Sequence, residues 1–201
     1  MFTMKRSAKM SQIDSIEKLK NPKYIKPILL NYTLKGQKKQ WEAVITHSSV
    51  SILLYHKEKN AFVLVKQLRP AVLNANKTDG FMYEMCAGII DKDASDAQIA
   101  KEEVYEECGY DIDVNSLEKV SSFYTNVGIS GAKQTIYYAE LTEDMKVNEG
   151  GGLPEEDIEV IYIPLEDAKS FMFDENYQKT SGVIMAFYWF FDKKFTSIQT
   201  Q

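Results

Sequence analysis

The sequence predicts an α+β fold in which a few helices pack on a mixed β-sheet. Short runs rich in β-branched and aromatic residues recur along the chain, and polar turns separate them. Few segments show helical periodicity, so most of the predicted strands have no crossover helix between them. Residues 181–191 are apolar on most faces, which indicates a helix buried against the sheet.

Length and composition exclude several classes of protein. The 201 residues suffice for one well-buried domain with a small appendage. With 29 acidic and 24 basic residues the net charge is −5, which argues against a nucleic-acid partner. The longest apolar run, residues 182–191, is too short to span a membrane, so no membrane partner is expected. Cys86 and Cys108 are too few for a disulfide framework, which favours a reducing, cytoplasmic location.

The chain is predicted to have an N-terminal appendage before its main domain. Residues 1–20 contain no apolar core of a signal peptide, and we expect them to be disordered. Residues 21–48 are predicted to form strands around a turn at residues 36–40, ahead of the main domain at residues 49–201. Trp41 is expected to pack locally, and the alternative is that it anchors a partner subunit or a base.

The remaining elements follow from apolar patterning and turn residues. The predicted strands are residues 28–34, 41–46, 50–55, 62–67, 83–90, 120–124, 135–141 and 158–163. Helices are predicted at residues 95–109, 164–171 and 181–191. Pro70 is predicted to end the strand before it or to lie at a sheet edge. Residues 127–132 and 149–157 are loops rich in glycine.

The predicted helix at residues 95–109 has signals at both ends. Ser95 suits the N-cap position, and Gln98 three residues later completes a capping-box pattern. Gly109 suits the left-handed residue that follows a helix. The apolar stripe expected to face the sheet consists of Ala97, Ala100, Val104 and Cys108.

A second face of this helix is acidic. Glu103, Glu106 and Glu107 project together, and Glu102 lies beside them. Like charges four residues apart destabilise a helix, and acids near its C-terminus oppose the macrodipole. One interpretation is a solvated acidic face, which the helix alone favours. The other is that these oxygens bind a hard cation such as Mg²⁺.

The segment before the helix favours the cation, because together they resemble the Nudix box. The positions that match its spacing are Gly88, Glu103, Val104, Glu106, Glu107, Gly109 and, loosely, Tyr110. Two positions depart from the motif: Ala94 stands where the first Glu is expected, and Glu102 stands where Arg is expected. In the family those two residues commonly pair as a structural salt bridge, so their loss removes a brace from Glu103.

Other blocks resemble one branch of the superfamily, the UDP-sugar (UDP-glucose) diphosphatases, which are relatives of ADP-ribose diphosphatases. These blocks are residues 63–72, 86–88, 106–110, 128–131 with Gln134 and Thr135, and 150–153. The resemblance covers residues 24–191 and implies a Nudix-type αβα sandwich, with residues 49–201 as the Nudix hydrolase domain. It also implies a homodimer built through the N-terminal strands, and a need for Mg²⁺, for which Mn²⁺ could substitute.

The resemblance and the chemistry of a diphosphate together suggest a metal site. The expected ligands are Glu103, Glu106, Glu107 and the carbonyl of Ala87, with Glu107 essential for catalysis. A divalent cation would lie between these carboxylates and the diphosphate oxygens, which would otherwise repel each other. We expect the general base outside this set, on the glycine-rich loop, at Glu155 or Glu156. The alternative for that loop is a solvated acidic turn.

Five further residues are candidates for binding substrate. The planar fork of Arg69 suits a substrate phosphate or an inter-subunit carboxylate. Glu84 would meet a ribose or Arg69, and simple exposure at a strand edge is the alternative. Gly88, Gly128 and Ser130 would let the backbone approach the substrate.

Three rival sites are less favoured. A calcium loop beginning at Asp91 lacks the glycine needed at its sixth position. Cys108, in acidic surroundings, is expected to be a core thiol and not a nucleophile. His47 and His56 fall at strand ends or turns and are expected at the surface.

The expected function is Mg²⁺-dependent hydrolysis of UDP-sugars such as UDP-glucose, giving UMP and a sugar 1-phosphate. ADP-ribose hydrolysis is the nearest alternative. A non-catalytic Nudix-fold module that binds nucleotides is the alternative of another class. The retained trio of glutamates argues against that module, because binding alone gains nothing from their repulsion.

Overall fold

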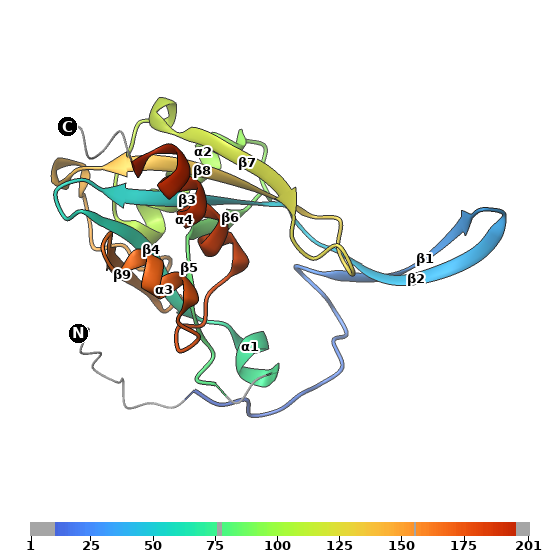
Figure 1. The fold of residues 1–201 in the computed structure, drawn as a ribbon. Helices are drawn as coiled ribbons and strands as arrows, with labels where there is room; N and C mark the ends of the chain where they lie inside the picture. Colours follow the sequence, from blue (N-terminus) through green and yellow to red (C-terminus); the bar gives the residue numbers. More distant parts are fainter. Residues whose placement is uncertain (1–10, 76–77, 155, 196–201) are drawn as a thin grey trace.

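A seven-stranded mixed sheet forms the centre of the main domain (Figure 1). The computed structural model describes residues 11–75, 78–154 and 156–195. The strands of this sheet are β3 (Ser49–His56), β4 (Ala61–Leu68), β5 (Phe81–Glu84), β6 (Cys86–Ile89), β7 (Glu118–Tyr124), β8 (Lys133–Leu141) and β9 (Ile158–Pro164). Strands β3 and β8 are parallel and the other pairs are antiparallel, so the prediction of a mixed sheet is confirmed.

Strands β3 and β4 diverge, and the divergence builds the site. They pair only where residues 54–56 face residues 61–63. Beyond that, β6 takes up the free edge of β3 and β5 takes up the free edge of β4. The single strand predicted at residues 83–90 is therefore wrong: the chain changes partner at Met85 and forms two strands.

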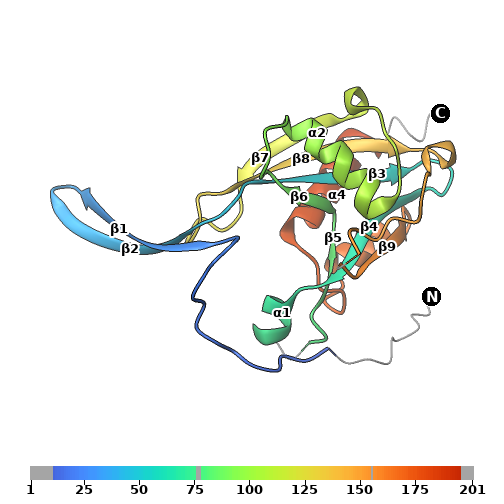
Figure 2. The same cartoon turned by 180° about the vertical axis from the view of Figure 1, so that it is seen from behind.

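Helices cover both faces of the sheet, which confirms the αβα sandwich (Figures 1 and 2). Helix α2 (Asp96–Glu103) packs on one face, where Ile52 and Leu54 point toward it. Helices α3 (Ala168–Phe173) and α4 (Ser181–Lys193) pack on the other face, with Leu53 and Tyr55. Successive residues of β3 alternate between two cores, so the strand is buried from Val50 to His56 and is mostly apolar.

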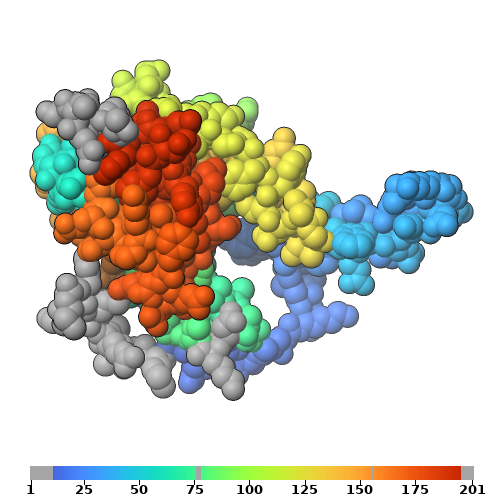
Figure 3. Space-filling model, in the orientation of Figure 1, coloured from blue at the N-terminus to red at the C-terminus, as the bar shows by residue number. Residues whose placement is uncertain are grey.

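The N-terminal strands β1 (Lys26–Leu34) and β2 (Gln37–Ile45) form a separate antiparallel hairpin. It extends well away from the body of the molecule (Figures 1 and 3). The prediction of a turn at residues 36–40 is wrong, because Leu34 already pairs with Gln37 across a two-residue turn. Residues 11–25 contain no helix or strand, and residues 1–10 of the predicted disordered terminus lie outside the described residues.

Two other helices differ from expectation. Pro70 does not simply end a strand: it begins the short helix α1 (Pro70–Ala75), since proline suits the first turn, where an amide N–H has no helical partner. Helix α3 begins at Ala168, later than predicted, because Pro164 still pairs with Ala61 in β9. The chain also forms two short 3₁₀ turns, η2 (Val114–Ser116) and η3 (Glu143–Met145).

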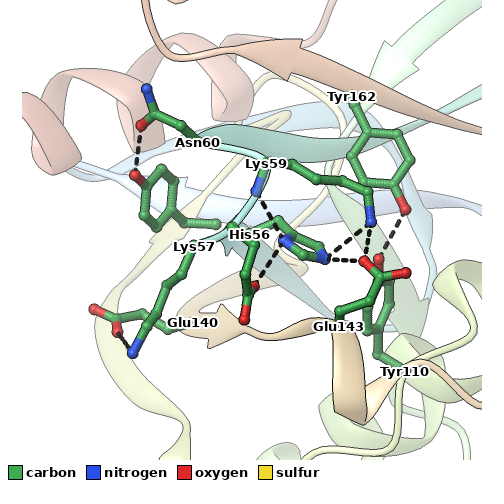
Figure 4. Close-up of polar contacts among 10 residues, drawn as sticks. His56, Lys57, Lys59, Asn60, Tyr110, Glu140, Glu143 and Tyr162 are labelled. Carbon is green, nitrogen blue, oxygen red and sulfur yellow. Dashed lines mark hydrogen bonds and ion pairs between the residues drawn. The ribbon is translucent and has the colours of Figure 1, made fainter.

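His56 lies in the interior, so its predicted surface position is wrong, whereas His47 is exposed. The parallel partner strand β8 runs on into η3, which places Glu143 over the His56 ring at 3.2 Å from Nε2 (Figure 4). Glu58 lies 3.3 Å from Nδ1, and Lys59 contacts both the ring and Glu143. Burial, followed by the charge of Lys59, lowers the pKa of His56, although the charges of Glu58 and Glu143 oppose that shift.

Among the described residues, no helix has the length and apolar character needed to cross a membrane. Cys86 and Cys108 are both buried and carry free thiols. The expectation that Cys108 is a core thiol is confirmed.

Candidate active site

The acidic helix begins where the sequence predicts but changes character halfway. The Ser95 hydroxyl accepts a hydrogen bond from the Gln98 amide at 3.2 Å, as an N-cap does. After Glu103 the helix continues as the π-helical turn η1 (Val104–Cys108), which ends at Gly109 with φ of +79°. The prediction of one helix over residues 95–109 is therefore incomplete, because the segment is an α-helix followed by a π-helical turn. Wider turns of this kind occur often at functional sites, and this one bears Glu106 and Glu107.

The glycine-rich loop closes over the end of this helix. Amides of Gly151 and Gly152 donate to the carbonyl oxygens of Glu107 and Glu106 at 2.9 and 3.0 Å. These bonds satisfy carbonyls that a helix end leaves without partners. The loop is thereby fixed against the acidic turn, and its residue Glu156 accepts a hydrogen bond from the Leu153 amide at 2.8 Å. The other predicted base, Glu155, lies outside the described residues.

Glu107 is the most deeply buried of the acids. Its side chain is 5% exposed, and its Oε2 accepts a hydrogen bond from the Ala87 amide on β6 at 3.0 Å. Burial raises the pKa of Glu107 to about 8, although the bond from Ala87 opposes that shift. The negative charges of Glu103 and Glu156 raise it further. The structure thus brings the helix, strand β6 and the loop together at this carboxylate.

Glu103 shares the same electrostatic environment. Burial raises its pKa to about 7, and the charges of Glu106 and Glu156 add to the shift. Gly88 on β6 lies directly beneath it: a Cβ atom at Gly88 would stand 1.9 Å from Oε1 of Glu103. The close approach of Glu103 to the strand therefore requires glycine at position 88. The predicted contact of Gly88 with substrate stays a prediction.

Arg69 and Glu84 form a bidentate ion pair beside the acids. Nε of Arg69 donates to Oε1 of Glu84 at 2.7 Å, and one terminal nitrogen donates to Oε2 at 2.8 Å. Of the partners considered for Glu84, Arg69 is the observed one, and the carboxylate facing Arg69 belongs to its own chain. The hydrogen bond to Glu84 raises the pKa of Arg69, and the charges of Glu107 and Glu156 add to the shift, which places the guanidinium within the field of the site.

Gly128 and Ser130 contact a different part of the molecule. The Gly128 carbonyl accepts a hydrogen bond from the indole of Trp41 at 2.8 Å, and the Val44 amide donates to Ile129 at 2.7 Å. The Ser130 hydroxyl accepts from the amide of Ala132 at 3.1 Å. This loop therefore supports the base of the hairpin, and its predicted role in binding substrate stays a prediction.

The donor set suits a hard cation by its chemistry. It offers oxygen atoms only, and burial and mutual repulsion penalise the charges of Glu103 and Glu107, a cost that a divalent ion would offset. Across the described ranges, no three His, Cys, Asp or Glu side chains converge closely enough to form a ready metal cage. Repulsion between carboxylates favours such a spread.

Sequence reasoning did not single out Lys92, which pairs with Glu102 next to Glu103.

The raised pKa values of Glu103 and Glu107 predict that metal-free protein loses stability as pH rises. Between pH 6.5 and 8.5 the folded state binds more protons than the unfolded state, whose glutamates titrate near 4.5. The free energy of unfolding should therefore fall across this window, most clearly above pH 7.5, where His56, whose lowered pKa has the opposite effect, is neutral in the unfolded state as well. Urea unfolding in EDTA would measure it. Glu107→Gln should flatten the slope, and an equal slope in that variant would contradict the assignment.

Gly88→Ala should weaken metal binding while leaving the fold intact. The new methyl group would displace the end of the Glu103 side chain, which is flexible, and not the backbone. We expect a loss of about tenfold in Mn²⁺ affinity, measured by titration calorimetry. Gly131→Ala is the matched control, because a Cβ there would meet nothing within 4 Å. Unchanged affinity in Gly88→Ala would remove Glu103 from the ligand set.

Comparisons with known proteins agree with this geometry. The family model described as NUDIX domain matches residues 45–184. The uridine diphosphate glucose pyrophosphatase NUDT14 of Bos taurus is 38% identical over 196 residues, which cover 84% of this chain and 88% of that protein. Its counterpart in Mus musculus is 37% identical over 198 residues, with 85% and 89% covered. The GDP-mannose pyrophosphatase of Cronobacter sakazakii is 38% identical over 121 residues, with 60% and 62% covered.

The matched region spans both the divergent sheet and the acidic helix, so the resemblance first seen in the box extends to the sheet and to helices α2 and α3. This chain belongs to the Nudix family.

Proposed function

We propose that this protein is a divalent-metal-dependent diphosphatase of nucleoside diphosphate sugars, and that UDP-glucose is its preferred substrate. The products would be UMP and glucose 1-phosphate. The observation that most supports the reaction is the buried carboxylate of Glu107, held against β6 among other acids. The uracil preference is supported by the UDP-glucose pyrophosphatases, which are matched over most of their length.

Glu103, Glu106 and Glu107, with the Ala87 carbonyl, would hold Mg²⁺, or Mn²⁺ in its place. When bound, such an ion polarises the diphosphate and lowers the pKa of a water molecule. The protein contributes the positions of the ligands. The Ala87 amide fixes Glu107, and the glycine at position 88 admits Glu103.

Glu156 is our proposed general base. It lies outside the proposed ligand set, and its charge acts on both Glu103 and Glu107. A base so placed can accept a proton from water that attacks phosphorus next to these ligands. Glu155 remains the second candidate from the same loop.

Arg69 is proposed to orient the diphosphate. A guanidinium has five N–H donors, and the bonds to Glu84 account for two of them. Glu84 is 12% exposed and holds the fork in a fixed direction beside the acids. Arg69 would therefore offer a positive charge to the phosphates without reorganisation.

We also propose that a second copy of this chain covers the N-terminal hairpin. An isolated two-stranded hairpin is marginally stable in water, yet this one extends from the body and exposes large apolar side chains. Those side chains are Leu29, Leu30, Tyr32, Leu34, Trp41 and Ile45. A symmetric dimer would bury them against their counterparts.

The proposed reaction is tested with a panel of UDP-glucose, GDP-mannose and ADP-ribose, assayed with Mg²⁺ and with EDTA. We expect UDP-glucose to have the highest kcat/KM and EDTA to abolish turnover. The glutamine side chain has nearly the same size as glutamate, so Glu107→Gln should keep its fold. It should lose at least about a hundredfold in kcat. A preference for ADP-ribose or GDP-mannose would overturn the substrate assignment, and an active Glu107→Gln would overturn the ligand assignment.

The proposed dimer is tested by light scattering at micromolar concentration. Wild-type protein should have twice the mass of one chain, and Leu29→Asp in the hairpin should shift it toward monomer. Phe173→Asp on α3 is the matched control, because Phe173 is also a large exposed side chain, 65% exposed, but lies outside the hairpin. A monomeric wild type would contradict the proposal.

A further inference from the structure

An ion pair joins the loop that leaves β6 to the acidic helix. Lys92, in the loop between β6 and α2, contacts Oε2 of Glu102. The other oxygen, Oε1, accepts a hydrogen bond from the amide side chain of Gln98 at 3.0 Å. Both oxygens of Glu102 are therefore engaged, one by the loop and one by the preceding turn of its own helix.

This contact bears directly on the proposed metal ligand Glu103, which follows Glu102 in the chain. Glu103 lies against Gly88 on β6, so its position depends on how closely the helix and strand approach. The Lys92–Glu102 pair ties the helix to the loop that follows β6, on one side of Glu103. The bond from the Ala87 amide to Glu107 ties the helix to β6 on the other side at 3.0 Å. Glu103 thus lies between two contacts, one that joins the helix to the loop after β6 and one that joins the helix to β6 itself.

Lys92 also supplies a positive charge near the acids. Its charge acts on Glu103 and Glu106 as well as on its partner Glu102. Glu102 and Ala94 are also the two positions where the chain departs from the Nudix box. A lysine on the loop and a glutamate on the helix restore a link between loop and helix with the charges exchanged.

We propose that Lys92 and Glu102 form a charge-reversed brace that positions Glu103 for metal binding. This inference rests on the proposed role of Glu103 as a ligand. Lys92 and Glu102 are positioning residues, because neither belongs to the proposed ligand set. Their side chains are 50% and 35% exposed, and pairs this exposed add little to stability. The brace should therefore affect the metal site more than the unfolding transition.

The test is a charge exchange in the full-length chain. Lys92→Glu and Glu102→Lys are made singly and together, and Mn²⁺ affinity is measured by titration calorimetry without substrate. Each single variant should weaken Mn²⁺ binding about tenfold, the low end of the loss seen for residues that support metal ligands. The double variant should recover most of that loss, because it restores the pair with lysine at the helix position. The Mg²⁺ concentration for half-maximal turnover should follow the same order.

Lys101→Glu is the matched control, because Lys101 lies next to Glu102 but pairs with Asp111 at 2.9 Å. It should bind Mn²⁺ like wild type, which separates the brace from the general effect of added negative charge. Single variants that bind like wild type, or a double variant without recovery, would overturn the brace. Glu103→Gln, made in parallel, tests the ligand assignment by itself: if it binds Mn²⁺ normally, that assignment fails, whatever the exchange shows.

Discussion

The buried carboxylate of Glu107 is the constraint on which the site depends. Ionising a carboxyl group that is 5% exposed costs free energy, and the hydrogen bonds from the Ala87 amide and the Cys86 thiol offset only part of that cost. The helix must therefore be held by other contacts. Its apolar side chains supply them, since Ala100 and Val104 of the predicted stripe and also Ile99 are fully buried against the sheet. Packing energy keeps the acids in place although their electrostatics oppose it.

The divergence of β3 and β4 explains why distant parts of the chain meet at this carboxylate. Each strand gives up half of one edge, and the segment formed by β5 and β6 crosses the gap between them. That segment bears Glu84, Ala87 and Gly88, while Arg69 follows the end of β4. A regular sheet would have kept β3 and β4 paired along their length, and it would have left no backbone amide free to bind a carboxylate from the helix.

Local chemistry made much of this fold predictable. The cap at Ser95, the left-handed Gly109 and most strand positions along the chain follow from neighbouring residues, and the sequence indicates them. The π-helical turn, the change of partner at Met85 and the burial of His56 depend on contacts with distant elements, which no local pattern encodes. The same holds for Lys92: its spacing of ten residues from Glu102 is meaningful only once the loop folds back onto the helix.

The acids at the end of the helix and the glycine-rich loop are best understood as one unit. Acidic side chains near a helix C-terminus add to the negative end of the macrodipole. The amides of Gly151 and Gly152 oppose this by placing N–H groups on the last carbonyl oxygens. Because these bonds fix the loop up to Gly152, the movement that the proposed role of Glu156 as general base would require would have to begin after Gly152. The bond from Leu153 to Glu156 would then be the contact that such a movement has to break.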